Sequence, residues 1–335
     1  MNLTVVIPCR NEINHIEGCI DAIYNSSFSF KINLNVFIVD GMSDDGTIDL
    51  LERKKNNYPN LKIVKNYNQL TPFAFNLGIN AGGKVDFVQI IGARHFISTN
   101  YLETCVNVLK SNSQIWCVGG KIINEFSNKK SQIISMSMSN VFGMGLGNFR
   151  TLNSSGFTDT VTSPMYPYWV FEKIGFFDEE LIRNQDDDFN YRITKSGGKI
   201  YYENNIYLKY YVRTSYKRLW QQFFQYGYWK VYVNKKHKNL TTYRQIIPSF
   251  FILYIIFVPL LLITTTFPSI FVLLPLILYM ILAIYFSSIH IKYFFSSLKT
   301  YFILHFSYGL GYLRGFFDFF IIRKLPSNSQ EKLSR

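Results

Sequence analysis

Two stretches decide the fold of this chain: Leu3–Glu12, which reads LTVVIPCRNE, and Asn35–Thr47, which reads NVFIVDGMSDDGT. Each opens with a run of β-branched and aliphatic residues, which predicts a buried strand, and each then changes to a polar loop. Between them, Glu12–Tyr24 carries isoleucines near helical spacing and predicts a helix. Strand, loop and helix therefore alternate from the first residues, as in an α/β protein.

The same alternation continues to about residue 120. It predicts a mostly parallel sheet with helices on both faces, and such sheets bind ligands beyond the carboxyl ends of their strands. Arg10, Glu12, Asp40 and Gly92–His95 are expected at those ends. Ser43 or Asp44 is expected to cap the second helix. The predicted strands are Leu3–Pro8, Asn35–Val39, Lys62–Lys65, Asp86–Ile91 and Ile115–Gly119, and the predicted helices are Glu12–Tyr24, Gly46–Asn56, Thr71–Ala81 and Asn100–Lys110.

The next part of the chain has weaker signals. Residues 121–165 are rich in Ser, Asn and Gly, which is typical of a long functional loop over a site or of a disordered linker. A helix is predicted to begin in Val170–Ile174, and Glu180–Ser196 carries an acidic cluster. Two short strands are predicted at Ile200–Tyr202 and Tyr207–Tyr211.

Composition limits the class of protein. The chain has 335 residues, 48% of them hydrophobic, so a full core needs no disulfide, and the four cysteines are expected to be reduced thiols. The formal charge of +13 gathers beside apolar segments, which favours a membrane surface over nucleic acid, for which no motif is present. No basic leader precedes the first strand, so we expect no signal peptide and a cytosolic first half.

The last third predicts a membrane hairpin, because residues 245–291 contain no Asp, Glu, Lys or Arg. Two spans are predicted at Ile246–Thr266 and Ser269–Phe286, and the basic residues outside them place both ends in the cytosol. Arg213–Tyr232, rich in aromatic residues with basic flanks, predicts an interfacial helix. Tyr301–Ile322 carries charged residues, which favours a re-entrant or interfacial helix over a third span.

These segments predict four regions. Residues 1–212 would form the α/β domain, 213–244 the interfacial helix with a basic linker, 245–324 the membrane region and 325–335 a tail. The expected location is the cytoplasmic membrane, with the α/β domain facing the cytosol.

Three places offer chemistry. Asp40 could accept a hydrogen bond from a uracil or ribose, or could serve only its own turn. Three carboxylates, Asp186–Asp188, fan over different faces of a helix, so one could act as a general base; the alternative is a solvated first turn favoured by the helix dipole. After the strand at Asp86–Ile91, Arg94 could bind a diphosphate and His95 could be a metal ligand or a packing residue.

Together these motifs resemble the family 2 glycosyltransferases, which have the GT-A fold, a Rossmann-like, mostly parallel sheet. Within that family the chain is similar to the succinoglycan-type, membrane-associated enzymes of surface polysaccharide synthesis. The resemblance covers roughly residues 3–235 and is weaker at Tyr308–Gly311. It rests on Val6–Glu12, Val39–Thr47, Asn76–Gly78, Asp159–Val161, Val170–Glu179, Arg183–Arg192 and Gln222–Gly227.

The resemblance implies roles for matching positions. Asp186 would be the catalytic base of an inverting transfer. Asp188 and Arg192 would be its structural companions on the acceptor and diphosphate side. Gln222, Gln225 and Tyr226 of the family's Gln-x-x-Arg-Trp element would lie on that side too. The nucleotide sugar, with UDP as the expected nucleotide, would be bound by Pro8, Arg10, Glu12, Asp40, Asn76 and Arg94.

Two departures concern the diphosphate. The family's metal-binding Asp-x-Asp falls on Gly92-Ala93-Arg94, so the Mg²⁺ or Mn²⁺ that the resemblance implies has lost both ligand positions. His95, one residue displaced, could substitute as a ligand, or Arg94 could neutralise the diphosphate without a cation. Gln225 replaces the arginine of the Gln-x-x-Arg-Trp element.

The expected function is transfer of a sugar from a nucleotide diphosphate sugar to a polyprenyl-linked saccharide. A different reading is a degenerate, non-catalytic protein that binds a sugar nucleotide or scaffolds a membrane assembly; the lost Asp-x-Asp favours it and Asp186 opposes it. A processive synthase would need more spans. A dinucleotide oxidoreductase would need Gly-x-Gly-x-x-Gly after the first strand.

Overall fold

The computed structural model describes residues 1–126, 128–145, 150, 152–211, 215–241, 243–266 and 268–326. The chain forms two compact units. The first, here called the sheet unit, is Met1–Glu125 with Gly147–Tyr211; the second, the helical unit, is Phe126–Leu146 with Val212–Arg335. These units differ from the predicted boundary at residue 212, because an internal segment of the first half belongs with the C-terminal helices. Most of the predicted tail lies outside the described residues.

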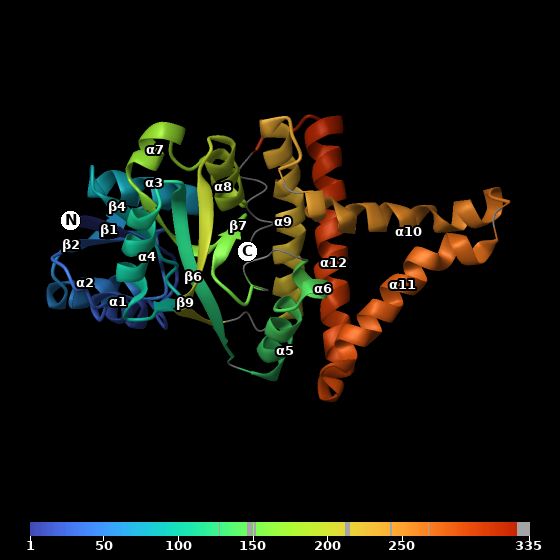
Figure 1. Cartoon of the computed structure of the whole chain (residues 1–335), viewed down its shortest axis with the longest axis horizontal. Helices are drawn as coiled ribbons and strands as arrows, with labels where there is room; N and C mark the ends of the chain where they lie inside the picture. Colours follow the sequence, from blue (N-terminus) through green and yellow to red (C-terminus); the bar gives the residue numbers. More distant parts are fainter. Residues whose placement is uncertain are drawn as a thin grey trace. The chain divides into compact units, whose positions relative to one another are not determined.

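The sheet unit contains one nine-stranded sheet with the strand order β3-β2-β1-β4-β8-β6-β9-β5, and β7 pairs with β9 (Figure 1). The first four strands in this order are parallel, as predicted. The rest of the sheet is mixed, because β8 runs antiparallel to both β4 and β6 while β6 and β9 are parallel. The strands are β1 Asn2–Cys9, β2 Asn33–Asp40, β3 Leu61–Lys65, β4 Phe87–Ile90, β5 His95–Ile97, β6 Ile115–Glu125, β7 Gly156–Thr158, β8 Thr162–Pro167 and β9 Lys199–Tyr211.

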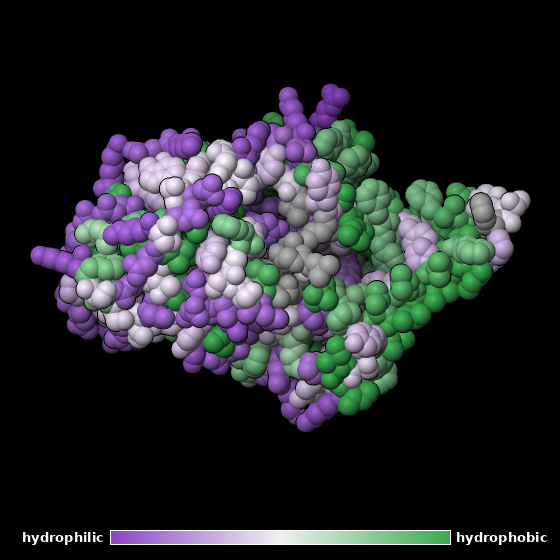
Figure 2. Space-filling model, viewed as in Figure 1, coloured by the Kyte–Doolittle hydropathy of each residue, from purple (hydrophilic) through white to green (hydrophobic). Residues whose placement is uncertain are grey.

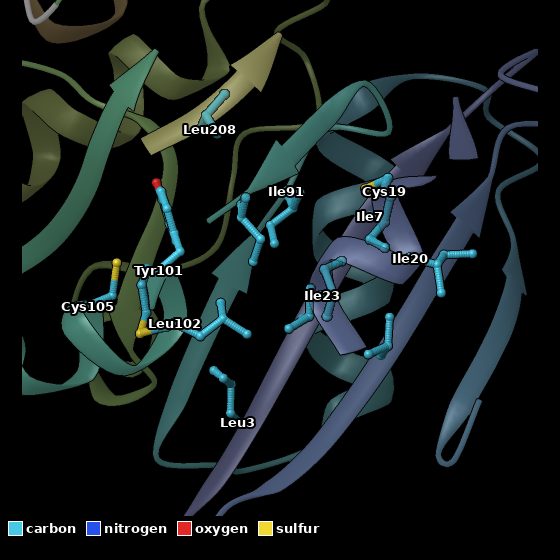
Figure 3. Close-up of a cluster of buried hydrophobic side chains, with 14 of the residues drawn as sticks. Leu3, Ile7, Cys19, Ile20, Ile23, Ile91, Tyr101, Leu102, Cys105 and Leu208 are labelled. Carbon is cyan, nitrogen blue, oxygen red and sulfur yellow. The ribbon is translucent and has the colours of Figure 1, made fainter. Parts of the chain in front are cut away.

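Helices cover both faces of this sheet. Side chains alternate along each strand, so apolar residues project from both faces and each face is buried against helices. Val5 and Ile7 of β1 face one core with α1 and α4, whereas Val6 faces another with α3, α7 and α8. Figure 3 shows the first core, in which Ile20 and Ile23 of α1 lie near the strands. The helices are α1 Ile16–Tyr24, α2 Thr47–Lys54, α3 Thr71–Gly82, α4 Tyr101–Ser111, α7 Trp169–Ile174 and α8 Gln185–Lys195. All four cysteines are buried, free thiols.

The predicted loop at 121–165 is wrong over most of its length. β6 continues to Glu125, helices α5 (Lys129–Met138) and α6 (Val141–Met144) follow, and β7 and β8 complete the segment. Polar sequence here reflects capping rather than a loop, since the Asn128 side chain accepts from the Ser131 backbone at the start of α5. The two strands predicted near residues 200 and 207 are one strand, β9, with an irregular register against β6.

The helical unit is built on α9 (Tyr216–His237) and α12 (Phe294–Phe316), which pack side by side (Figure 1). Glycine permits the close approach of the two backbones: a Cβ on Gly227 would lie 2.1 Å from the Tyr308 carbonyl oxygen, and one on Gly311 would lie 2.0 Å from that of Phe224. The helix predicted at Arg213–Tyr232 thus exists from Tyr216, and α12 covers one of its faces; residues 212–214 are not described.

The predicted hairpin is present as α10 (Ile247–Thr264) and α11 (Ser269–Ser288), each long and apolar enough to cross a membrane. Little of either helix is buried, and Figure 2 shows their apolar surface in green. Among the described residues no third helix meets the same criteria, and α12 begins at Phe294, before the stretch predicted at Tyr301–Ile322. A short π-helical turn, Phe317–Ile321, follows α12.

Candidate active site

The loops after β1 and β2 are joined into one structure at the carboxyl edge of the sheet. Asn11, in the left-handed region with φ of 55°, accepts from the Asp44 amide at 2.9 Å and donates its own side-chain amide to the Asp44 carboxylate at 2.7 Å. The Asn11 backbone amide donates to Ser43 Oγ at 2.9 Å, and that of Glu12 donates to Thr47 Oγ1 at 3.0 Å. Much of the polar Asp40–Thr47 motif therefore shapes the loop itself.

Asp40 is buried at the end of β2, opposite Cys9 of β1. Its two carboxylate oxygens accept from the backbone amide of Ser43 at 3.0 Å and from its hydroxyl at 2.5 Å. The expectation that Ser43 or Asp44 caps the next helix is wrong: Gly46, with φ of 91°, is the N-cap of α2, and Ser43 holds Asp40 instead. A carboxylate keeps further lone pairs, so Asp40 retains capacity for a ligand.

Pro8 and Arg10 lie at the same edge. Pro8 is half-buried and pairs with Val39 in the parallel register. The aliphatic stem of Arg10 packs against Gly41, where a Cβ would lie 3.3 Å from two of its carbons. Its Nη1 is buried and has no hydrogen-bond partner within the described part of the chain. A buried cationic nitrogen without an acceptor is unfavourable unless a ligand supplies one.

Arg94 and Glu12 form an ion pair between the turn after β4 and the loop after β1. Arg94 Nε donates to both carboxylate oxygens of Glu12, at 2.7 and 2.9 Å. The Glu12 side chain is 16% exposed and that of Arg94 is 38% exposed, so the pair is accessible to solvent at this edge of the sheet and is not part of the core. The two residues are far apart in sequence, and no local pattern predicted this pairing.

His95 is directed into the protein. Its Nδ1 lies 2.7 Å from Ser163 Oγ and accepts from the Gly92 amide at 3.3 Å. Burial, and secondly the positive charge of Arg150, lower the pKa of His95 from 6.5 to about 4, so the ring is neutral near pH 7. Ser163, with φ of 43° in β8, was not expected at the site.

These residues do not fit a divalent cation. Gly92 and Ala93 carry no ligand atoms, and His95, whose Nδ1 is held by the Gly92 amide and Ser163, could offer only Nε2, which is fewer ligand atoms than a divalent cation needs. Within the described ranges, no group of three or more His, Cys, Asp or Glu side chains could hold a metal ion. His95 packs and forms hydrogen bonds within the protein, and the metal role predicted for it remains a prediction.

The acidic cluster opens α8. Asn184, with φ of 61°, precedes the helix, and the three carboxylates of the first turn differ in their exposure. Asp186 is exposed, Asp187 is partly buried and Asp188 is fully buried. The first turn therefore presents one of the three, Asp186, most fully to solvent, as a base that must reach an acceptor requires.

Asp188 and Arg192 stabilise this helix. Arg192 Nε donates to Asp188 Oδ2 at 2.9 Å. Its Nη atoms donate to the carbonyl oxygens of Ile174 at 2.6 Å and Phe176 at 2.8 Å. The guanidinium of Arg192 thus joins α8 to the turn after α7, in keeping with a structural companion of Asp186, and a place on the diphosphate side remains a prediction.

Asn76 on α3 is also used internally. Its side-chain amide donates to the Phe177 carbonyl and to Glu179 Oε1, each at 2.9 Å, and its oxygen accepts from the Phe177 amide at 3.0 Å. Both amide hydrogens are engaged, so Asn76 joins α3 to the segment before α8, and we do not retain it as a nucleotide ligand.

The remaining predicted residues belong to α9 of the helical unit. Gln222 donates to the Tyr226 hydroxyl at 2.7 Å on a partly buried face. Gln225 is buried, and its oxygen accepts from Trp229 Nε1 at 3.0 Å. Their expected place over the diphosphate and acceptor entrance remains a prediction.

The loops after β1 and β2 are paired at the sheet edge, Arg10 and Arg94 lie at that edge, and an exposed carboxylate opens α8. In α/β sheets ligands bind beyond the carboxyl ends of the strands, and cationic side chains there suit a phosphorylated ligand. The family profile of glycosyl transferase family 2 matches residues 4–174. The chain belongs to this family and is a glycosyltransferase.

Two relatives extend the match. The chain is 34% identical to dolichyl N-acetyl-alpha-D-glucosaminyl phosphate 3-beta-D-2,3-diacetamido-2,3-dideoxy-beta-D-glucuronosyltransferase of Methanococcus voltae, over 67% of this chain and 71% of that protein. It is 26% identical to succinoglycan biosynthesis protein ExoA of Rhizobium meliloti (strain 1021), over 73% of each.

Solved structures confirm the fold. The mannosyltransferase PcManGT from Pyrobaculum calidifontis, solved in complex with GDP-Man and Mn²⁺, aligns with a TM-score of 0.66 at 15% identity, over 94% of this chain and 87% of that one. At this identity the likeness concerns architecture, and it confirms the predicted GT-A arrangement with C-terminal helices.

Proposed function

We propose that this protein transfers a sugar, with inversion, from a nucleotide diphosphate sugar to a hydroxyl of a lipid-linked saccharide at a membrane. The observation that carries the proposal is the exposed Asp186, which stands at the start of a helix fixed by the Asp188–Arg192 pair. A base presented to solvent on a rigid element can reach an acceptor hydroxyl.

In the proposed reaction, Asp186 removes the proton of the acceptor hydroxyl as that oxygen attacks the anomeric carbon. The attack comes from the face opposite the nucleotide, so the new glycosidic bond forms as the bond to the diphosphate breaks and its electron pair leaves with the diphosphate. Asp40 would receive the base or ribose at the sheet edge, and Arg10 would offer its unpaired buried nitrogen to the donor.

The lipid-linked acceptor and the membrane are supported by the helical unit and by the relatives. The Methanococcus voltae enzyme is named for a dolichyl N-acetyl-alpha-D-glucosaminyl phosphate acceptor, and the Rhizobium meliloti protein for succinoglycan biosynthesis. The surface of the hairpin is largely apolar (Figure 2). Large apolar side chains are exposed on both of its helices, for example Ile263 at 83% and Phe271 at 63%. Basic residues flank the hairpin, so the catalytic domain would face the cytosol.

An apolar groove in the helical unit also suits a lipid chain. Its volume is about 600 Å³, and Trp220 of α9 stands beside the first half of α12 there. Lys299 at this groove would bind a phosphate of the lipid-linked acceptor. The lining residues are Trp220, Phe295, Leu298, Lys299, Phe302, Ile303 and Phe306.

The test is sugar-nucleotide turnover by the full chain in detergent. A panel of UDP-, GDP- and dTDP-sugars is combined with polyprenyl-linked saccharide acceptors, and nucleotide release and glycolipid product are both measured. Product that requires Asp186 would support the proposal and identify the donor. Nucleotide binding without product from any pair would favour instead a non-catalytic protein, which the missing Asp-x-Asp also suits.

A further inference from the structure

The diphosphate position of this site contains an arginine where the family expects acidic metal ligands. Gly92-Ala93-Arg94 occupies the Asp-x-Asp position, and the neighbouring His95 is directed toward Ser163. The site therefore lacks the donor set for a cation while it holds a cationic side chain at the same turn. Without a bound cation, another positive charge is needed beside the diphosphate to stabilise it as the leaving group.

The hydrogen bonds of Arg94 leave one side of its guanidinium open. Nε donates to both oxygens of Glu12, and neither Nη atom makes a hydrogen bond within the described residues. Since a guanidinium has five N–H donors in a rigid plane, binding through Nε leaves the two terminal nitrogens for a second ligand. The 38% exposure of the side chain makes these nitrogens accessible.

We propose that Arg94, oriented by Glu12, binds the diphosphate of the sugar donor directly and supplies the positive charge that a divalent cation supplies in metal-dependent relatives. This inference rests on the proposed function. A guanidinium matches two phosphate oxygens at once, and it stays protonated at any physiological pH. Charge gathers on the diphosphate as the anomeric bond breaks, and a fixed cation there stabilises the leaving group.

Glu12 acts in this arrangement as a positioning residue rather than as the nucleotide ligand that its motif suggested. It fixes Arg94 before the donor arrives, so less side-chain entropy is lost on binding. The pair is neutral overall, but a phosphate on the Nη side lies closer to the guanidinium than to the carboxylate, so attraction exceeds repulsion. Arg10, with its buried and unpartnered Nη1, adds a second cation at the same edge of the sheet.

The test compares binding of UDP and GDP with that of UMP and GMP to the full chain by calorimetry, in EDTA and in Mg²⁺. We expect the preference for the diphosphate to be the same in both solutions. Arg94→Gln should weaken diphosphate binding by about 10- to 100-fold, the loss expected for one or two charge-assisted hydrogen bonds, and change monophosphate binding little. Arg53→Gln, an exposed arginine on α2, is the matched control.

Two Glu12 variants separate positioning from charge. Glu12→Gln keeps an acceptor for Nε, whereas Glu12→Ala removes it, and both remove the negative charge. If Glu12 acts by orienting Arg94, only Glu12→Ala should lose much of the preference for the diphosphate over the monophosphate. Equal effects of the two variants would overturn the role of Glu12.

Diphosphate binding that collapses in EDTA, or an Arg94→Gln variant that binds UDP and GDP like the parent, would overturn the role of Arg94. Arg94→Lys serves as a second variant. A lysine keeps the positive charge but lacks the planar group that binds two phosphate oxygens at once, so its affinity for UDP and GDP should be intermediate. The proposed function has its own point of failure: a parent protein that forms no product, whatever its metal dependence, would overturn that proposal instead.

Discussion

Arg192 Nε lies 2.9 Å from Oδ2 of the fully buried Asp188, one helical turn away on α8. The same guanidinium continues to the carbonyl oxygens at the end of α7. The pair therefore fixes the first turn of α8, and with it the direction in which Asp186 leaves the helix.

Removal of one partner of this pair should destabilise the sheet unit. Arg192→Ala leaves a buried carboxylate without its cation, and we expect a loss of about 3 kcal/mol in the free energy of unfolding. Denaturant unfolding in detergent, followed by tryptophan fluorescence, measures it. Lys195→Ala, an exposed residue on the same helix, should change stability by less than about 0.5 kcal/mol. Equal losses of stability in the two variants would contradict a stabilising role for the Asp188–Arg192 pair.

Asp186→Asn should lower kcat by about 10²- to 10⁴-fold, the usual contribution of a general base. Because Asp186 is exposed, stability and nucleotide affinity should be unchanged. The steady-state transfer assay and a thermal melt check both statements. Asp187→Asn is the control, and a larger loss of kcat in that variant would assign the base to Asp187.

Gly227→Ala and Gly311→Ala should each destabilise the helical unit by about 1–3 kcal/mol. The added methyl carbon would lie about 2 Å from a carbonyl oxygen of the opposite helix, so α9 and α12 would have to separate. Thermal unfolding in detergent measures the change. Gly156→Ala in β7, where a Cβ meets nothing within 4 Å, is the control. If Gly227→Ala and Gly311→Ala were as stable as this control, the close packing of α9 against α12 would be contradicted.

Stability should fall in mild acid because of His95. Its pKa is lowered to about 4 in the folded protein and is 6.5 ordinarily, so the unfolded chain binds a proton first. The stability that the neutral ring contributes is complete above about pH 6.5 and is lost as the pH falls toward about 4, at roughly 1.4 kcal/mol per unit. Thermal melts between pH 6.5 and 4 should show that His95→Gln loses less stability than the parent as the pH falls. If both proteins lost the same stability, the lowered pKa of His95 would not be the cause.

Thiol labelling can test the membrane topology. All four native cysteines are buried, so an introduced cysteine should be the main reactive thiol in sealed membrane vesicles. Thr266→Cys, in the turn between α10 and α11, and Lys292→Cys, after α11, should react with an impermeant reagent from opposite sides. Labelling of both from the same side would show that the hairpin does not cross.

The sequence predicted the strands and helices of the first 120 residues well, because each has a clear hydrophobic period and a polar break. It could not predict the partner of Arg94, since the Glu12 carboxylate comes close only when β1 and β4 align. It also misread 121–165, where Asn128 and Ser131 are helix caps. Composition alone does not separate a capped helix from a loop.

The position of the candidate site residues could be predicted better than their roles. Asp40 ends β2 and Asp186 lies in the first turn of α8, and the roles of both toward a substrate remain predictions. A motif marked Asn76 and Arg192 as site positions without showing whether each side chain serves a ligand or the protein itself. Burial and hydrogen bonding made that distinction: both side chains are occupied by backbone carbonyl groups.

The segment Phe126–Leu146 leaves the sheet unit and packs with helices that are made much later. Asn140 donates to the Tyr301 hydroxyl at 2.5 Å, and the Phe142 carbonyl oxygen lies 2.8 Å from His305 Nε2. During synthesis on the ribosome, α5 and α6 emerge long before α12 and must remain without these partners until the chain is nearly finished. The helical unit can therefore reach its final packing only after its last long helix has been made.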